Sequence, residues 1–243
     1  MNALRFSLGA VGAVRRDAGL VSQGETHSYA EFPSYSRAER TADGIIHLLG
    51  VTFGLAACVS LVLAALPSQD VLLWLALGLY GLGLLAMLVC SAAYNLTVQP
   101  RIKAVFRRLD HAAIFVMIAG TYSPFTLIAI GGAWGFGLLA FVWTVALAGV
   151  TVKLCWPRRF DRLSVFAYLL LGWSILVAFD PLLAAVSAAG LILLLVGGLL
   201  YSLGVVFHLW QRLPYQNAIW HACVLAAAAC HFTAVLSEVA LAR

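Results

Sequence analysis

Long runs of apolar residues, separated by short polar stretches, fill the chain from residue 45 onward. A helix needs about 20 predominantly apolar residues to cross the hydrocarbon core of a bilayer. Seven runs approach or reach this length, so the pattern predicts an all-α, polytopic membrane protein built as a seven-helix bundle. We expect the spans at Ile45–Leu66, Val71–Tyr94, His111–Ile130, Gly135–Cys155, Leu163–Phe179, Leu182–Leu209 and Ala218–Leu241.

The composition also indicates a membrane protein. Of the 243 residues, 63% are hydrophobic and only 10% are charged, which is far too apolar for a water-soluble domain of this length. The first 36 residues are weakly patterned, and Arg15 and Arg16 stand where a signal peptide would need small residues for cleavage. We therefore predict a loose cytoplasmic tail over residues 1–36 and a membrane domain over residues 37–243.

The positive charges are divided very unevenly between the two sides of the predicted membrane domain. Fourteen of the fifteen Lys and Arg residues lie before the first span or in loops on the same side, and only Arg243 lies on the other. Because Lys and Arg near span ends resist translocation, we expect a cytoplasmic N-terminus and an external C-terminus. Basic loops against an anionic leaflet explain the net charge of +5, so no nucleic-acid partner is expected. The short loops favour a bacterial inner membrane, and the oligomeric state stays open.

Ionisable and amide side chains within the spans gather at the predicted cytoplasmic side. Such side chains are costly in a membrane and are functional candidates by default. Three pairs are spaced i, i+4, which places both members of a pair on one face of a helix. The pairs are Asp43 with His47, Ser91 with Asn95, and Asn217 with His221. We therefore expect polar side chains from several helices to meet at one level.

Asp110 and His111 open the third predicted span at the same level. Adjacent residues diverge by about 100° around a helix, so only one of the two can face a shared centre. We expect this to be Asp110, because a carboxylate suits a helix N-terminus and can orient a ligand or bind a metal. A simpler interpretation is that these polar residues cap helices, contact headgroups or form hydrogen bonds between helices.

Four segments of the chain carry a family resemblance. In this order, ERTADGIIHLLG, SAAYN, RRLDHAAIFVMIAGTYSPF and PYQNAIWHACVLAAAACHF closely resemble the hemolysin III branch of the progestin and adipoQ receptor (PAQR) family, which includes the adiponectin receptors. The similarity covers residues 37–241. It implies a seven-helix bundle with a cytoplasmic N-terminus and a zinc ion near the cytoplasmic leaflet, held by three histidines from the second and seventh spans.

The residues of this chain depart from the family's zinc site. Ser91, Asp110 and His221 match the family pattern, but Asn95 and Asn217 occupy two of the three positions where the resemblance implies histidine ligands. Zinc prefers imidazole, thiolate or carboxylate over a neutral amide oxygen. The site is therefore predicted to be degenerate, with amides that donate and accept hydrogen bonds in place of metal ligands.

A rebuilt metal site is the alternative prediction. Where relatives have an amide in the first motif, this chain has the carboxylate of Asp43. Together with His47, Asp110 and His221 it would offer two nitrogens and two oxygens, a set that suits zinc, iron or manganese. This alternative requires the first span to approach the centre of the cluster.

The sequence leaves three functions open. The first is a non-catalytic membrane protein that senses or maintains the lipid environment, with a hydrophobic ligand in the bundle cavity. The second is a metal-dependent hydrolase, similar to the ceramidase-like amidases proposed among relatives, with Asp110 and Ser91 as catalytic residues and His221 as a metal ligand. The third is the pore-forming or cytolytic activity behind the family name, although the spans carry no repeated ring of charge. Membrane lipids are the expected partners in each case.

Overall fold

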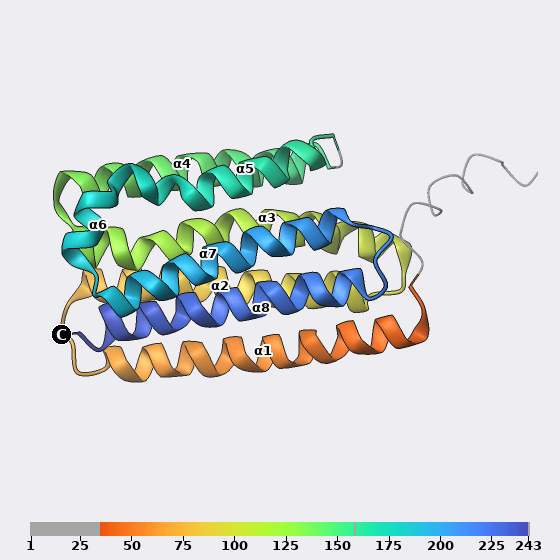
Figure 1. Cartoon of the computed structure of the whole chain (residues 1–243), viewed down its shortest axis with the longest axis horizontal. Helices are drawn as coiled ribbons and strands as arrows, with labels where there is room; N and C mark the ends of the chain where they lie inside the picture. The colour runs from red at the N-terminus through yellow and green to blue at the C-terminus, as the bar shows by residue number, and fades with distance from the viewer. Residues whose placement is uncertain (1–34, 158, 243) are drawn as a thin grey trace, which may run out of the picture. The chain divides into compact units, whose positions relative to one another are not determined.

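A computed structural model of the chain describes residues 35–157 and 159–242 (Figure 1). These residues form helices and no strand, and seven helical stretches are long and apolar enough to cross a membrane. Residues 1–34 of the predicted tail lie outside the described residues. The helices are α1 (Arg37–Ala65), α2 (Val71–Leu96), α3 (Pro100–Pro124, continued by a π-helical turn to Ile130), α4 (Gly132–Cys155), α5 (Asp161–Trp173), α6 (Phe179–Ala185), α7 (Ala188–Leu209) and α8 (Gln216–Val235, continued by a π-helical turn to Ala240).

Two helices begin well before the apolar runs from which the spans were predicted. α1 begins at Arg37 because Ser36 and Glu39 form a reciprocal capping box, in which each side chain accepts from the other residue's backbone N–H. α3 begins at Pro100, a residue that suits the first turn of a helix. The polar residues that precede these two apolar runs therefore lie on helices rather than in loops.

The predicted boundary between the fifth and sixth spans was wrong. We expected the sixth span to begin at Leu182, but α5, a 3₁₀ turn and α6 form one continuous span that ends at Ala185. Pro181 is the third residue of α6, a position whose N–H has no partner within the helix, so the proline does not break it. The next helix, α7, begins at Ala188, and the hydroxyl of its N-cap residue Ser187 accepts from the backbone N–H of Gly190.

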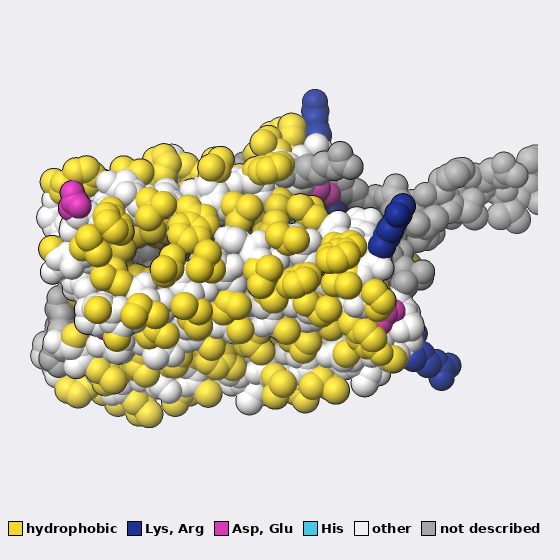
Figure 2. Space-filling view, in the orientation of Figure 1, with side chains coloured by type: hydrophobic (Ala, Val, Ile, Leu, Met, Phe, Trp, Pro, Cys, Tyr) yellow, Lys and Arg dark blue, Asp and Glu magenta, His cyan; other side chains and the backbone are white. Residues whose placement is uncertain are grey.

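The seven spans lie side by side, with α1 along one edge of the bundle and α4 and α5 along the opposite edge (Figure 1). α1 packs against α2 and α8, α2 against α3, and α7 against α8. Lys and Arg side chains on the visible face stand at the end where α1 begins, while the flank is apolar (Figure 2). At that basic end Asp161 accepts hydrogen bonds from Arg107 (2.6 Å) and Lys153 (2.8 Å), which ties α3, α4 and α5 together.

Two glycines allow the backbones of α2 and α3 to pack closely together. A methyl group built on Gly83 would lie 2.9 Å from the carbonyl oxygen of Val116 and 3.0 Å from Cα of Met117. A methyl group on Gly120 of α3 would lie 2.8 Å from the carbonyl oxygen of Leu79. Small residues at such crossings let two membrane helices pack backbone to backbone.

We predict that Gly83→Ala lowers the free energy of unfolding by about 1–3 kcal/mol, because the methyl group meets backbone atoms that cannot turn away. Gly78→Ala, in the same helix, is the control, since no atom lies within 4 Å of its added methyl group. Denaturation of both variants in detergent micelles measures the difference. Equal stability of the two variants would contradict the close α2–α3 contact.

Candidate functional site

The polar side chains predicted to converge do meet, at the end of the bundle where α1 and α8 begin. We call this group the Asp43 cluster; it comprises Asp43 and His47 of α1, Ser91 and Asn95 of α2, and Asn217 and His221 of α8. Both members of each i, i+4 pair take part. The cluster thus joins the first, second and seventh spans at a single level.

Asp43 is the hub of the cluster. Its side chain is buried, and its two carboxylate oxygens accept from partners on α8. Oδ1 lies 2.6 Å from Nδ1 of His221, and Oδ2 accepts from Nδ2 of Asn217 at 2.9 Å. On its own helix, Oδ2 lies 3.4 Å from Nε2 of His47. A buried carboxylate needs such partners because an unpaired charge in an apolar interior is very costly.

The two asparagines extend the network to α2. Nδ2 of Asn217 also donates to Oδ1 of Asn95 at 3.1 Å, and Nδ2 of Asn95 donates to the backbone carbonyl of Ser91 at 3.0 Å. The hydroxyl of Ser91 lies 3.4 Å from Nε2 of His221. These contacts form a closed circuit: from Asp43 on α1 to Asn217 on α8, to Asn95 and Ser91 on α2, to His221 on α8, and back to Asp43. Both amides therefore act as hydrogen-bonding groups within the cluster.

His47 is the least satisfied member of the cluster. Its ring lies 4.4 Å from the ring of His221, centroid to centroid. Its Nε2 atom is buried and has no hydrogen-bond partner within the part of the chain that the structure describes. Asp43, His47 and His221 each offer a ligand atom, and the three atoms lie within 4.8 Å of one another. These three residues therefore form a group that could hold a metal ion.

Asp110 stands beside this group and not within it. It lines the cavity described below together with His47, Ser91 and His221. Three of the four residues of the predicted rebuilt set are thus brought together, and the fourth lies next to them. The backbone carbonyl of the adjacent His111 accepts from the hydroxyl of Tyr168 at 2.8 Å.

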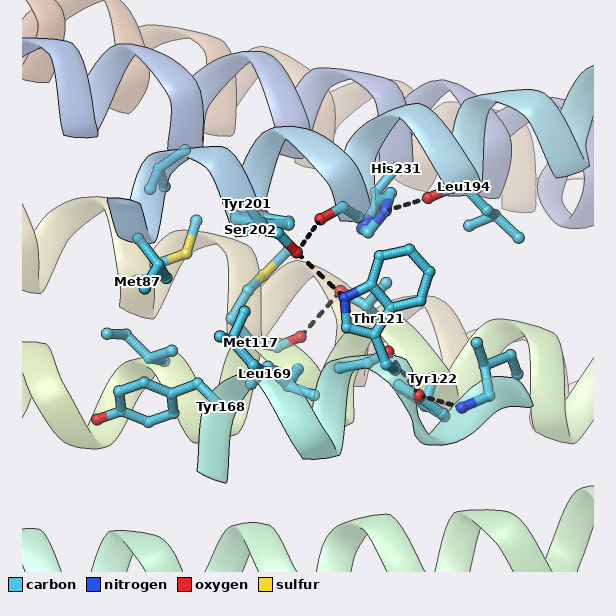
Figure 3. Close-up of a pocket in the computed structure, with 18 of the residues that line it drawn as sticks. Met87, Met117, Thr121, Tyr122, Tyr168, Leu169, Leu194, Tyr201, Ser202 and His231 are labelled. Atoms are coloured by element: carbon cyan, nitrogen blue, oxygen red, sulfur yellow. Dashed lines mark hydrogen bonds between the residues drawn. The ribbon is translucent and has the colours of Figure 1, made fainter. Parts of the chain in front are cut away.

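A cavity of about 460 Å³ extends from the Asp43 cluster into the apolar interior between α2, α3, α5, α7 and α8. Its lining is mostly apolar, with a few polar groups among the apolar side chains (Figure 3). One of these is His231, whose Nε2 lies 3.2 Å from the carbonyl oxygen of Leu194. Others are Thr121, Tyr201 and Ser202. Sequence analysis assigned none of these four to a site, although each is a polar residue within a span.

Comparison with known proteins agrees with the resemblance in the motifs. Residues 35–232 match the family model described as "Haemolysin-III related". The chain belongs to this family. A "Hemolysin-3 homolog" from Bacillus subtilis (strain 168) is 38% identical over 198 residues, which cover 82% of this chain and 93% of the relative. "Hemolysin-3" from Bacillus cereus is 38% identical over 198 residues, covering 82% and 90%. The human "Monocyte to macrophage differentiation factor" is 30% identical over 166 residues, covering 65% and 67%.

The three-histidine zinc site that the resemblance implies does not fit this haemolysin-III-related chain. Two of its positions hold Asn95 and Asn217, and the amide nitrogen of Asn217 faces Asp43 and Asn95. An N–H group cannot coordinate a metal ion, and amide oxygens are poor ligands for zinc. At the two positions where the resemblance implies histidine ligands, Asn95 and Asn217 instead form hydrogen bonds.

We predict that Asn95→Ala and Asn217→Ala are coupled in a double-mutant cycle by about 1 kcal/mol, because each removes a partner of the same partly buried hydrogen bond. The control cycle pairs Asn217→Ala with Thr144→Ala, since the hydroxyl of Thr144 donates only to the carbonyl of Ala140 in its own helix. The control cycle should be additive within about 0.5 kcal/mol. Unfolding free energies in micelles give both coupling values, and additivity of the asparagine pair would contradict the network.

Proposed function

We propose that this protein binds a long-chain membrane lipid in its central cavity and senses or maintains the lipid environment without catalysing a reaction. The observation that carries this proposal is the cavity itself, which combines about 460 Å³ of mainly apolar space with one polar end at the Asp43 cluster. An amphiphile needs that combination: apolar walls for its chain and a few fixed polar groups for its head.

The mouth of the cavity supports entry from the membrane. Five large apolar side chains that line the cavity are also exposed on the outer surface of the bundle: Leu176, Phe179, Leu183, Ile192 and Leu195. A hollow in the apolar surface lies beside α6 and α7 (Figure 2). Because this surface would face lipid chains in a membrane, a lipid could pass between α6 and α7 into the cavity without crossing water.

The orientation of the bundle belongs to the same proposal. The basic residues gathered at the end where α1 begins support a cytoplasmic location for that end. The Bacillus relatives support a bacterial inner membrane as the location of this protein. The polar end of the cavity would then lie near the cytoplasmic leaflet, where the head of a bound lipid would meet the Asp43 cluster.

Hydrolysis of a lipid amide is the second candidate function, because Ser91 and Asp110 line the cavity where the head of a bound lipid would lie. A bound metal would supply a Lewis acid and an activated water for this chemistry. The family's three-histidine site does not fit these residues, so this function would need a different set of metal ligands. A cytolytic role, raised by the name "Hemolysin-3" of one relative, would need a continuous water-filled path. The mainly apolar lining favours a lipid over ions.

The test is photo-crosslinking of a diazirine-bearing long-chain fatty acid to the protein in vesicles of phosphatidylethanolamine and phosphatidylglycerol. Leu195→Trp fills the mouth of the cavity and should lower crosslinking about tenfold, which corresponds to ~1.4 kcal/mol of binding free energy. Leu199→Trp is the matched control. It lies one turn further along α7 with similar exposure (53% against 51%), and it does not line the cavity.

Crosslinks mapped to cavity residues in the unaltered protein, and retained in Leu199→Trp, would support the proposal. Equal crosslinking of the two tryptophan variants would contradict it. Incubation of the same vesicles with ceramide, followed by analysis of released fatty acid, separates binding from hydrolysis. Release that depends on Asp110 would favour the second candidate.

A further inference from the structure

We propose that Asp43, His47 and His221 form a binding site for one divalent transition-metal ion, with a ligand set that differs from the three-histidine set implied by the family resemblance. The proposal goes beyond lipid binding and does not depend on it. It rests on the arrangement of these three side chains and on the buried nitrogen of His47.

The three side chains are almost completely shielded, with exposed side-chain fractions of 10% for Asp43, 6% for His47 and 10% for His221. Within the described residues, the Nε2 atom of His47 has no hydrogen-bond partner, although it is buried and close to the Asp43 carboxylate. At 3.4 Å, the contact of this nitrogen with Oδ2 of Asp43 is longer than a good N–H···O hydrogen bond, so the buried nitrogen is poorly satisfied. A metal ion between His47 and Asp43 would satisfy both side chains, because each would donate a lone pair to it.

The spacing of the ligand atoms is compatible with one ion. Two atoms bound to the same tetrahedral zinc at about 2.0 Å lie about 3.3 Å apart. Nε2 of His47 and Oδ2 of Asp43 already lie 3.4 Å apart. Nδ1 of His221 and Oδ1 of Asp43 are closer, at 2.6 Å, because they share a proton in a hydrogen bond. Binding would replace that proton, so these two side chains would move slightly apart.

The donor types narrow the class of metal. Two imidazole nitrogens and one carboxylate oxygen suit zinc, cobalt(II), iron(II) or manganese(II), whereas calcium and magnesium prefer an all-oxygen site. Ser91 and Asp110 lie beside the group and face the cavity, so a water molecule from that side can complete the coordination. Because Asp43 and His47 belong to α1 and His221 to α8, a bound ion would link the first and seventh spans.

Metal uptake by the full-length protein in detergent micelles tests the proposal directly. The protein is purified without a metal-binding tag, stripped with a chelator, loaded with Zn²⁺ or Co²⁺ and desalted. Elemental mass spectrometry should then find one ion per chain. Cobalt should also give the visible absorption of a nitrogen- and oxygen-ligated ion. His47→Gln should weaken binding by more than about 100-fold, beyond the ~10–100-fold typical of an outer-shell partner.

Two further variants keep the result interpretable. Asp43→Asn removes a different ligand and should also abolish stoichiometric uptake. His111→Gln removes a histidine that lies outside the ligand group and should bind as the unaltered protein does. Thermal unfolding of each metal-free variant identifies any that do not fold. Absence of metal from the folded, loaded protein would overturn the proposal, and so would equal uptake by His47→Gln and His111→Gln.

Discussion

The buried carboxylate of Asp43 is the constraint on which the polar end of this bundle depends. A charge in an apolar interior is tolerated only when it is surrounded by partners, and removal of one partner leaves an uncompensated group. Asp43 has two hydrogen-bond partners on α8 and a longer, 3.4 Å contact with His47 on its own helix. The first and seventh spans are therefore held at a fixed register, and Asn95 brings the second span into the same register.

This arrangement also shapes the cavity. The cluster closes one end of the space with hydrogen-bonding groups, while the rest of the lining is mostly apolar and reaches the outer surface beside α6 and α7. A molecule that fits would be apolar along most of its length and polar at one end. The shape and polarity of the cavity therefore match the amphiphile of our proposal, and this match requires no bound metal.

Much of the fold could be read from the sequence, because membrane spans are encoded by long apolar runs that local patterns reveal. The i, i+4 spacing also correctly placed Asp43 with His47 and Asn217 with His221 on shared helix faces. Other features depend on contacts between distant segments. The spacing could not show that α1 approaches α8 closely enough for Asp43 to contact His221. Nor could it show that Pro181 lies inside a helix, since that depends on where the neighbouring turn ends.

The position and the lining of the cavity also could not be predicted from the sequence. α5 and α7, two of the helices that line the cavity, make few contacts with each other, and loose packing of this kind has no local signature in the sequence. Thr121 and Ser202 lie on different spans, with no common spacing to connect them. The only signal in the sequence was that each is a polar residue within a span. Such a residue is a candidate for a functional site, but its position does not show which residues of other helices lie beside it.

In our proposal, Asp43 is the centre of the metal site, and no metal is bound at Asn95 and Asn217, the positions where the family resemblance implies histidines. Crystals of the full chain grown in a lipidic mesophase with zinc, with anomalous diffraction collected at the zinc absorption edge, test it most directly. The account predicts an anomalous peak in contact with Asp43, His47 and His221, and Asn217 hydrogen-bonded to Asp43 and Asn95. A peak bound by His221 between Asn95 and Asn217, with Asp43 turned away from it, would contradict the account.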